Sequence, residues 1–250
     1  MVPVISVADL SHHFPDGTRS LRTINLVVEE NEFIVVAGAN GSGKTTLFKH
    51  LNGLLLPGSG TVFVKGRPVK DNLAETRKRI GLVFQDADSQ IIGETVYDDV
   101  AFGPENLRLT RTEIDARVKR ALEDVGLLGS ENKSPHHLSG GEKRLLAIAG
   151  VLAMSPQVLL MDEPFSNLDY HAAITVLKRI VELHAAGHVI IISTHDLEKV
   201  LFHATRLIVM QNGAIVRDGS PEEIVPETEQ FGVRAPCSVQ LGRGIQAWGQ

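Results

Sequence analysis

A glycine-rich stretch between two apolar segments constrains this chain more than any other feature. Residues Gly38 to Thr46 read GANGSGKTT and contain the full G-x-x-x-x-G-K-[ST] pattern. The run FIVVAG precedes this stretch and the run TTLFKHLNGLLL follows the lysine, so we expect a strand, a glycine loop and a helix in that order. This context is the one that a phosphate-binding loop needs, and it predicts an α/β phosphate-loop fold.

The residue types in this loop suit a nucleotide with Mg²⁺. Backbone amides freed by the glycines can surround phosphates, Lys44 can reach the β- and γ-phosphates, and the Thr45 hydroxyl can bind the metal. The predicted nucleotide-binding residues of the loop are Gly38, Asn40, Gly41, Ser42, Gly43, Lys44, Thr45 and Thr46.

Three other apolar runs end in polar residues that could complete such a site. VLLMDEP ends with Asp162 and Glu163, and we expect the first near the metal and the second as general base for the attacking water. Taken alone, two acids there would be only the polar end of a strand. IIISTHD presents His195, which could hydrogen-bond a γ-phosphate. GLVFQD presents Gln85, whose amide could contact Mg²⁺ or the water.

The rest of the chain alternates strand and helix signals. The first third is rich in short apolar runs with turns, and residues about 73–150 are predicted to form a mainly helical lobe inserted between strand-containing parts. Within it, apolar spacing predicts a helix from Thr112 to Val125, with a Thr112-x-x-Asp115 start resembling a cap. Asn212-Gly213 predicts a hairpin. The predicted domain ends near residue 225, and periodicity fades in a tail of residues 226–250.

Composition narrows the function classes. The chain has 250 residues, 43% hydrophobic residues and a net charge of −5, which is typical of a soluble globular enzyme and not of a nucleic-acid binder. A single cysteine, Cys237, allows no internal disulfide, and the first residues lack a signal peptide, which favours the cytosol. The longest nearly unbroken apolar run, Leu145 to Met154, is half of the roughly 20 residues that span a bilayer. Any membrane crossing would need another polypeptide.

A second turn suited to an anion lies at the start of a predicted helix, in LSGGE. The motifs GANGSGKT, FQD, LSGGE, LLMDEP, SNLD and STHD follow one another in the order found in ATP-binding cassette ATPases, and the chain resembles that family from about Val4 to Ile224. The resemblance implies ATP as the nucleotide, a mixed-sheet core, an N-terminal antiparallel β part and a helical signature subdomain. It also implies that Ser139, Gly140 and Gly141, the signature turn of this family at the start of the signature helix, clamp ATP held by a partner subunit.

This resemblance assigns two further residues. Asp169, which ends SNLD, would link the two sites, and Phe14 matches a ring that stacks on adenine, although it could also be a core phenylalanine. One copy of each motif implies two ATPase subunits head to tail, as a homodimer or with a paralogue. Leu145-Leu146 replace the Arg-Val common in relatives, which leaves the support of the signature helix open.

TVYDDVAFGPENL and EKRLLAIAGVLAM resemble the ATPases of energy-coupling-factor transporters, which import cobalt, nickel and vitamins such as biotin. That branch implies a transmembrane coupling subunit, a substrate-binding membrane protein and a place at the cytoplasmic face of the membrane. The predicted docking segment runs from Gln85 to Leu109, with apolar Ile91, Ile92, Val96, Tyr97 and Phe102. Alternatives are another importer, a cassette ATPase of DNA repair or translation, or a regulatory module without hydrolysis. Glu163 and His195 argue against the last of these.

Overall fold

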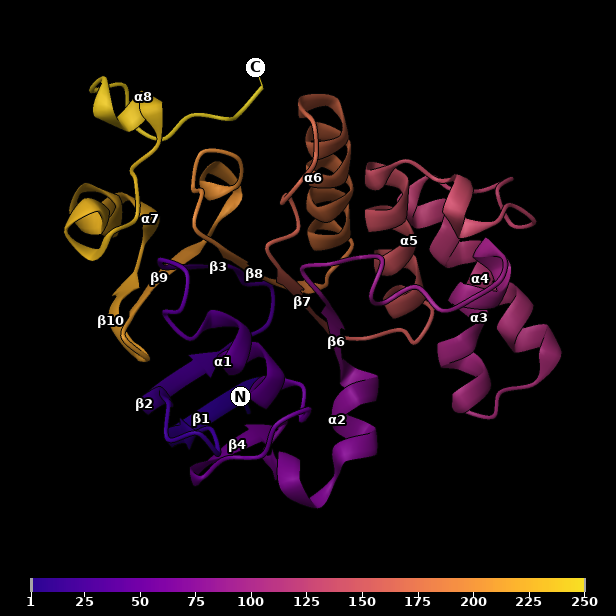
Figure 1. Cartoon of the computed structure of the whole chain (residues 1–250), viewed down its shortest axis with the longest axis horizontal. Helices are drawn as coiled ribbons and strands as arrows, with labels where there is room; N and C mark the ends of the chain where they lie inside the picture. Colours follow the sequence, from indigo (N-terminus) through magenta and orange to yellow (C-terminus); the bar gives the residue numbers. More distant parts are fainter. Residues whose placement is uncertain (1, 250) are drawn as a thin grey trace.

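The computed structural model describes residues 2–249 and arranges them in two sheets with helices around them (Figure 1). The larger sheet has six strands in the order β10-β9-β3-β8-β7-β6, and the smaller has four in the order β2-β1-β4-β5. This α/β arrangement of a mixed sheet and an antiparallel sheet confirms the predicted fold class.

Five neighbouring strands of the large sheet run parallel, and β10 joins β9 antiparallel. The strands are β3 (Phe33–Ala37), β6 (Ile80–Val83), β7 (Val158–Asp162), β8 (Val189–Thr194), β9 (Arg206–Gln211) and β10 (Ala214–Gly219). Every residue of β3, β6, β7 and β8 is buried, which explains why these strands read as unbroken apolar runs in the sequence. The hairpin between β9 and β10 turns at Asn212 and Gly213, both with positive φ, as their sequence predicts.

The small sheet is antiparallel throughout. Its strands are β1 (Ile5–His13), β2 (Arg19–Val28), β4 (Ser59–Val64) and β5 (Arg67–Pro68). Its apolar side chains pack against one face of the large sheet, where Leu10 and Leu21 join Ile34 and Phe48 in one core cluster. The hairpin from β1 to β2 thereby comes close to the helix that follows the glycine loop.

Helices flank these sheets. The α-helices are α1 (Lys44–Leu51), α2 (Leu73–Arg79), α3 (Val96–Asn106), α4 (Arg111–Val125), α5 (Gly140–Leu152), α6 (Tyr170–Ala185), α7 (Pro221–Ile224) and α8 (Cys237–Gln240). The 3₁₀ segments are η1 (Val69–Asp71), η2 (Pro135–His137), η3 (Leu201–His203) and η4 (Val225–Phe231). No helix among residues 2–249 has both the length and the apolar character that a membrane crossing requires.

The helical lobe is smaller than its predicted range of 73–150. It consists of α3, α4 and α5, which lie together at the right of Figure 1. Ile80–Val83 is instead the edge strand β6 of the large sheet, and α2 packs beside it. This four-residue run pairs in parallel with β7, so it belongs to the core, and the lobe helices begin at Val96.

The start of α4 also differs from its predicted cap. Thr110 is the capping residue: its hydroxyl accepts from the Glu113 N–H, and the Glu113 carboxylate accepts from the Thr110 N–H at 2.9 Å. Thr112 already lies inside the first turn, and Asp115 accepts a hydrogen bond from the Tyr97 hydroxyl instead. Asp115 therefore joins α4 to α3 rather than capping its own helix.

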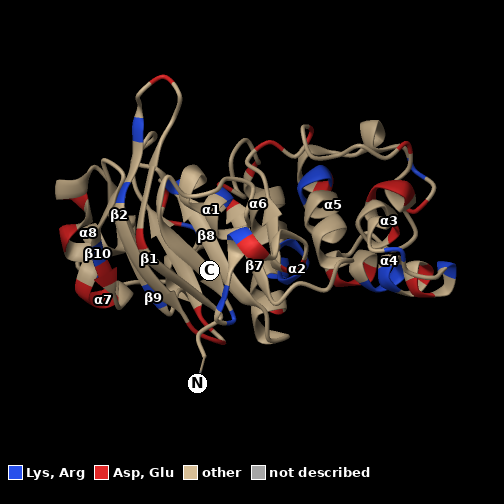
Figure 2. Ribbon diagram, turned by 90° about the horizontal axis from the view of Figure 1, so that it is seen from below, with Lys and Arg blue, Asp and Glu red and all other residues tan. Residues whose placement is uncertain are grey.

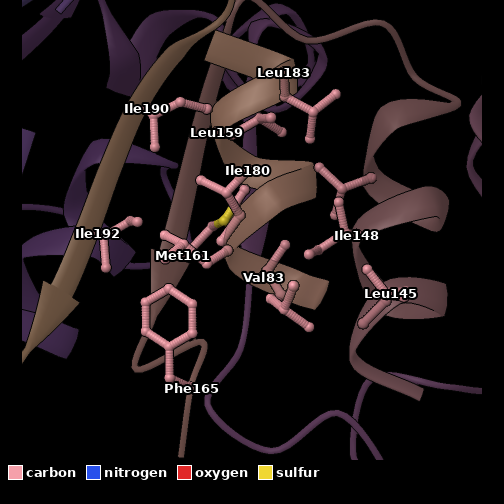
Figure 3. Close-up of a cluster of buried hydrophobic side chains, with 14 of the residues drawn as sticks. Val83, Leu145, Ile148, Leu159, Met161, Phe165, Ile180, Leu183, Ile190 and Ile192 are labelled. Carbon is pink, nitrogen blue, oxygen red and sulfur yellow. The ribbon is translucent and has the colours of Figure 1, made fainter. Parts of the chain in front are cut away.

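Helix α5 joins the lobe to the core. Figure 3 shows Leu145 and Ile148 of α5 on the side of Ile180 of α6, with Met161 of β7 beside Ile180. Leu145 and Leu146 are both buried, so the two leucines that depart from the family pattern support the signature helix through apolar packing.

The tail beyond residue 225 packs onto the core despite its weak periodicity. Val233 and Ala235 are buried, and the Trp248 ring meets the Tyr170 ring edge to face with centroids 5.1 Å apart. The Lys199 ammonium lies 5.5 Å from the centre of the Trp248 ring. In Figure 1 this yellow segment crosses from α8 towards α6.

Candidate active site

The glycine loop joins the end of β3 to the start of α1. Gly41 and Gly43 have φ of +80° and +105°, which side chains with a Cβ rarely adopt, and Gly43 is the N-terminal cap of α1. A cavity of about 460 Å³ opens over the loop. It is lined by Phe14, Thr18, Arg19, Ser20, Asn40, Gly41, Ser42, Gly43, Lys44, Thr45, Thr46, Gln85, Asp162 and Glu163.

Lys44 is held inside this loop with its ammonium group at the cavity wall. Its Nζ donates to the carbonyl oxygens of Gly38 at 2.6 Å and Ala39 at 3.2 Å, and lies 3.9 Å from Glu163 Oε1. Burial lowers the pKa of Lys44, while the carboxylates of Glu163 and Asp162 oppose that shift. An anion entering the cavity would meet a largely desolvated positive charge.

The loop is tied to the neighbouring strands through three side chains. The Thr45 hydroxyl donates to Asp162 Oδ2 at 2.6 Å, and the Ser193 hydroxyl donates to the other oxygen of the same carboxylate. These contacts join α1, β7 and β8 at the carboxyl ends of the parallel strands, where ligands bind in open α/β sheets. Thr46 also lines the cavity, and its hydroxyl accepts from the Ser20 hydroxyl at 2.8 Å.

Glu163 follows β7 in a conformation that non-glycine residues seldom adopt, with φ of +47°. Its N–H donates to the Ser193 carbonyl and hydroxyl oxygens, each at 3.1 Å, and these bonds hold the strained turn. His195 Nδ1 lies 2.9 Å from Glu163 Oε1. The structure thus brings Lys44 close to Glu163, and Glu163 close to His195, while the neighbouring Asp162 binds Thr45 of the loop helix.

Gln85 and Phe14 line the same cavity from different parts of the chain. Gln85 follows β6, and Phe14 lies in the β1–β2 hairpin, where its ring is partly exposed and packs edge-on against His12. This exposure separates Phe14 from a core phenylalanine. The same hairpin and the start of β2 add three cavity residues that no sequence motif indicated: Thr18, Arg19 and Ser20.

The signature turn does not line this cavity. Ser139 caps α5, where its hydroxyl accepts from the Glu142 N–H and the Glu142 carboxylate accepts from the Ser139 N–H at 2.8 Å. Ser139 and Gly140 are exposed, whereas Gly141 is buried against Ala172. Asp169 caps α6 and accepts from the Ala172 N–H at 2.8 Å. The signature turn and Asp169 are therefore neighbours, outside the nucleotide cavity of their own chain.

The family model described as ABC transporter matches residues 21–166, more than half of the chain. The chain belongs to the ABC transporter family. It is an ABC ATPase, and the matched range spans the glycine loop, the signature turn and Glu163.

Several relatives of this ABC ATPase are named "Energy-coupling factor transporter ATP-binding protein EcfA". One from Methanocaldococcus jannaschii is 47% identical over 229 residues, which cover 90% of this chain and 82% of that protein. Another from Methanothermobacter thermautotrophicus is 46% identical over 244 residues, covering 95% and 78%. The solved structure of cbiO1 from Clostridium perfringens, described as part of the ABC transporter complex cbiONQ, matches with a TM-score of 0.83 and 36% identity, covering 97% of each chain.

Proposed function

We propose that this ABC ATPase energises uptake through a membrane transporter of the energy-coupling-factor type, with cobalt, nickel or a vitamin such as biotin as cargo. Two relatives named EcfA, at 47% and 46% identity, support the transporter branch. The observation that carries the catalytic part is the cavity in which Lys44 and Glu163 face each other across 3.9 Å, with His195 bound to the same glutamate.

In this proposal the loop binds the phosphates of ATP and Phe14 stacks on the adenine. The Ser42 hydroxyl supports this role, because it is buried without a hydrogen-bond partner among residues 2–249 and a phosphate oxygen would satisfy it. The Lys44 ammonium would neutralise charge on the β- and γ-phosphates, and the amide that follows Gly43 would donate to them.

The oxygens of Thr45 and Asp162 fit Mg²⁺, and Gln85 lines the same cavity. Within the described residues no three His, Cys, Asp or Glu side chains gather as a metal site, so the ion would take its other ligands from phosphates and water, as Mg²⁺ commonly does. When bound, Mg²⁺ neutralises charge that builds up on the transferred phosphate. Ser193 holds the Asp162 carboxylate in place for this role.

Glu163 would act as general base for the water that attacks the γ-phosphate. His195 would orient the Glu163 carboxylate through its Nδ1 and present its other ring nitrogen to the phosphate. The exposed Ser139 and Gly140 would close over ATP held by a second ATPase subunit, identical or paralogous, while Asp169 would contact the opposite site. Each sandwiched site then needs two chains arranged head to tail.

A groove beside the Gln85 segment supports docking to the membrane subunits. It is lined by Asp88, Ile91, Ile92, Gly93, Pro135, His136 and Lys143. Of the predicted docking residues, Val96 is buried and Ile91 and Tyr97 pack partly into the core, whereas Ile92 and Phe102 are exposed. Figure 2 shows acidic and basic positions intermixed along α4 in the same lobe, a pattern that favours a protein partner over an anionic lipid surface. The protein would then lie peripherally at the cytoplasmic face of the membrane.

This proposal is tested by placing a charge on the docking surface. Ile92→Asp and Phe102→Asp should abolish recovery of the ATPase in the membrane fraction and cargo uptake, in cells that also express the genes next to that of the ATPase. ATP hydrolysis by the isolated subunit should stay near normal. Phe202→Asp is the matched control, because Phe202 and Phe102 are each 51% exposed and Phe202 lies on η3, outside the lobe. Wild-type protein that never associates with its neighbours' membrane proteins would contradict the transporter assignment.

A further inference from the structure

Arg144 lies on α5, in the second turn after the signature serine Ser139, and only 4% of it is exposed. Its Nη1 donates to the carbonyl oxygen of Phe84 and its Nη2 to that of Gln85, each at 2.6 Å. The planar guanidinium therefore holds two consecutive peptide groups just after β6.

Packing alone does not explain a buried cation at this position. The Arg144 Nε is buried without a hydrogen-bond partner in the described part of the chain, and Leu145 and Leu146 beside it fill the core. Burial lowers the pKa of Arg144, although the carboxylates of Asp86 and Asp162 oppose this shift. A buried charge seldom stabilises a fold more than an apolar side chain of similar size would. The role of the guanidinium therefore lies in the backbone carbonyl groups that it binds.

What Arg144 binds is the backbone of a cavity residue. Gln85 lines the nucleotide cavity, and it follows β6, an edge strand that pairs only with β7. Among residues 2–249, the segment after β6 therefore has no sheet neighbour on its outer side. Lys143, the residue before Arg144, holds the same segment through Asp88, with Nζ 2.6 Å from Oδ1. Two consecutive residues of α5 thus supply the missing support.

We propose that Arg144 is a positioning residue for ATP hydrolysis, which fixes the Gln85 backbone against α5 and so sets where the Gln85 amide reaches in the cavity. Arg144 lines no part of the cavity and acts only through Gln85. The inference rests on the proposed role of Gln85 in hydrolysis. It also makes the signature helix of each chain a support for that chain's own nucleotide site.

The test compares Arg144→Met with Arg117→Met in the purified full-length chain with Mg²⁺ and ATP. Arg117 is a matched control, because it is also a lobe arginine that donates to a backbone carbonyl, that of Ala153 at 3.2 Å, without contacting the Gln85 segment. Arg144→Met should lower kcat about tenfold or more with the KM for ATP within about threefold, because it removes positioning rather than binding. Arg117→Met should keep kcat within about twofold.

A double-mutant cycle separates positioning from general support of the fold. If Arg144 acts through Gln85, Arg144→Met should lower kcat by less than about twofold when it is added to Gln85→Ala. Arg144→Lys, which keeps the charge but not the fork, should fall between wild type and Arg144→Met and serves if the Met variant does not fold. Additive losses, or equal losses in the two arginine variants, would overturn the inference alone. A wild-type chain that hydrolyses no ATP would overturn the proposed function as well.

Discussion

The glycine loop and the signature turn both precede a helix, but they differ in which parts of the chain contact them. At the loop, other segments of the same chain converge: Thr45 binds Asp162, and Lys44 faces Glu163. At the signature turn, Ser139 is exposed and its hydrogen bonds come from its own helix. At the glycine loop a phosphate would therefore contact groups from several segments of the chain, whereas at the signature turn it would contact only the start of α5.

The serines of the two turns show the same contrast. The Ser42 hydroxyl is buried and unpartnered within residues 2–249, whereas the Ser139 hydroxyl already accepts a hydrogen bond. An unsatisfied buried group costs stability unless a ligand satisfies it, while a capping group stabilises its helix without any ligand. The first turn therefore holds a hydroxyl that a ligand could satisfy, whereas the second is stable without a ligand.

The largest expected effect comes from removing the proposed general base at the nucleotide site beside the glycine loop. Glu163→Gln should lower steady-state ATP hydrolysis about 100- to 1000-fold while ATP still binds, because an amide fills the same space but cannot accept the water's proton. Hydrolysis and nucleotide binding are measured on the purified chain. Glu123→Gln on the exposed side of α4 is the control. Near wild-type turnover in Glu163→Gln would remove the assigned base.

Mixing two defective chains tests whether the second turn serves the partner. Lys44→Ala breaks the loop and Ser139→Arg breaks the signature turn, so a mixed dimer keeps one site with both parts intact. An equimolar mixture should recover about a quarter of the wild-type rate if sites are independent, since half of the dimers are mixed and each has one working site. Differently tagged chains allow the mixed dimers to be isolated. No recovery in those dimers would contradict independent sites that cross the dimer.

Acid should lower the free energy of unfolding of the chain through a histidine on α1, the helix that follows the glycine loop. His50 on α1 is fully buried, and burial lowers its pKa to about 4, with His12 adding to this shift. The unfolded chain therefore takes up a proton below about pH 6.5 that the folded chain refuses until about pH 4, so stability falls as the pH falls through this window. Between pH 7 and pH 5 the loss from His50 should be about 2 kcal/mol.

His50→Phe should remove that part of the pH dependence, measured as the free energy of unfolding in denaturant at pH 7 and pH 5. His137→Phe, at an exposed position just before the signature turn, is the control for replacing a histidine by phenylalanine. Parallel pH profiles for wild type and His50→Phe would show that His50 is not responsible.

The smallest expected effect compares the two serines directly. Ser139→Ala should destabilise the chain without nucleotide by about 1 kcal/mol through loss of the α5 cap. Ser42→Ala should leave that stability unchanged or slightly higher, because no hydrogen bond of the hydroxyl is lost, yet it should weaken ATP binding. Thermal unfolding with and without ATP measures both effects. Equal destabilisation by the two substitutions would contradict the contrast between the turns.

Elements that depend on neighbouring residues could be predicted from the sequence, whereas pairings between strands that are distant in the sequence could not. The glycine loop and the Asn212-Gly213 hairpin depend on adjacent residues, so their conformations were predictable. The run Ile80–Val83 falls inside the predicted lobe range, and its pairing with β7, which is distant in the sequence, shows only in the structure. Arg144 lies in the quoted run EKRLLAIAGVLAM, but only the folded chain shows that it reaches the carbonyls of Phe84 and Gln85. Ser193 is a polar residue inside a buried apolar strand, and this pattern could have indicated that its hydroxyl binds Asp162.

The strand order of the large sheet also determines when the glycine loop can form during synthesis. Phe33 in β3 pairs with Ile190 in β8, and Ile34 pairs with Arg206 in β9, so both neighbours of β3 emerge late from the ribosome. Long-range parallel pairing is slow, and unpaired apolar strands are prone to aggregate before it is complete. A chain truncated before β8 would therefore contain the whole GANGSGKTT sequence without the strands that hold its loop. The glycine loop is thus translated early, but the strands on either side of β3, together with Asp162 and Glu163, become available only after most of the chain has been made.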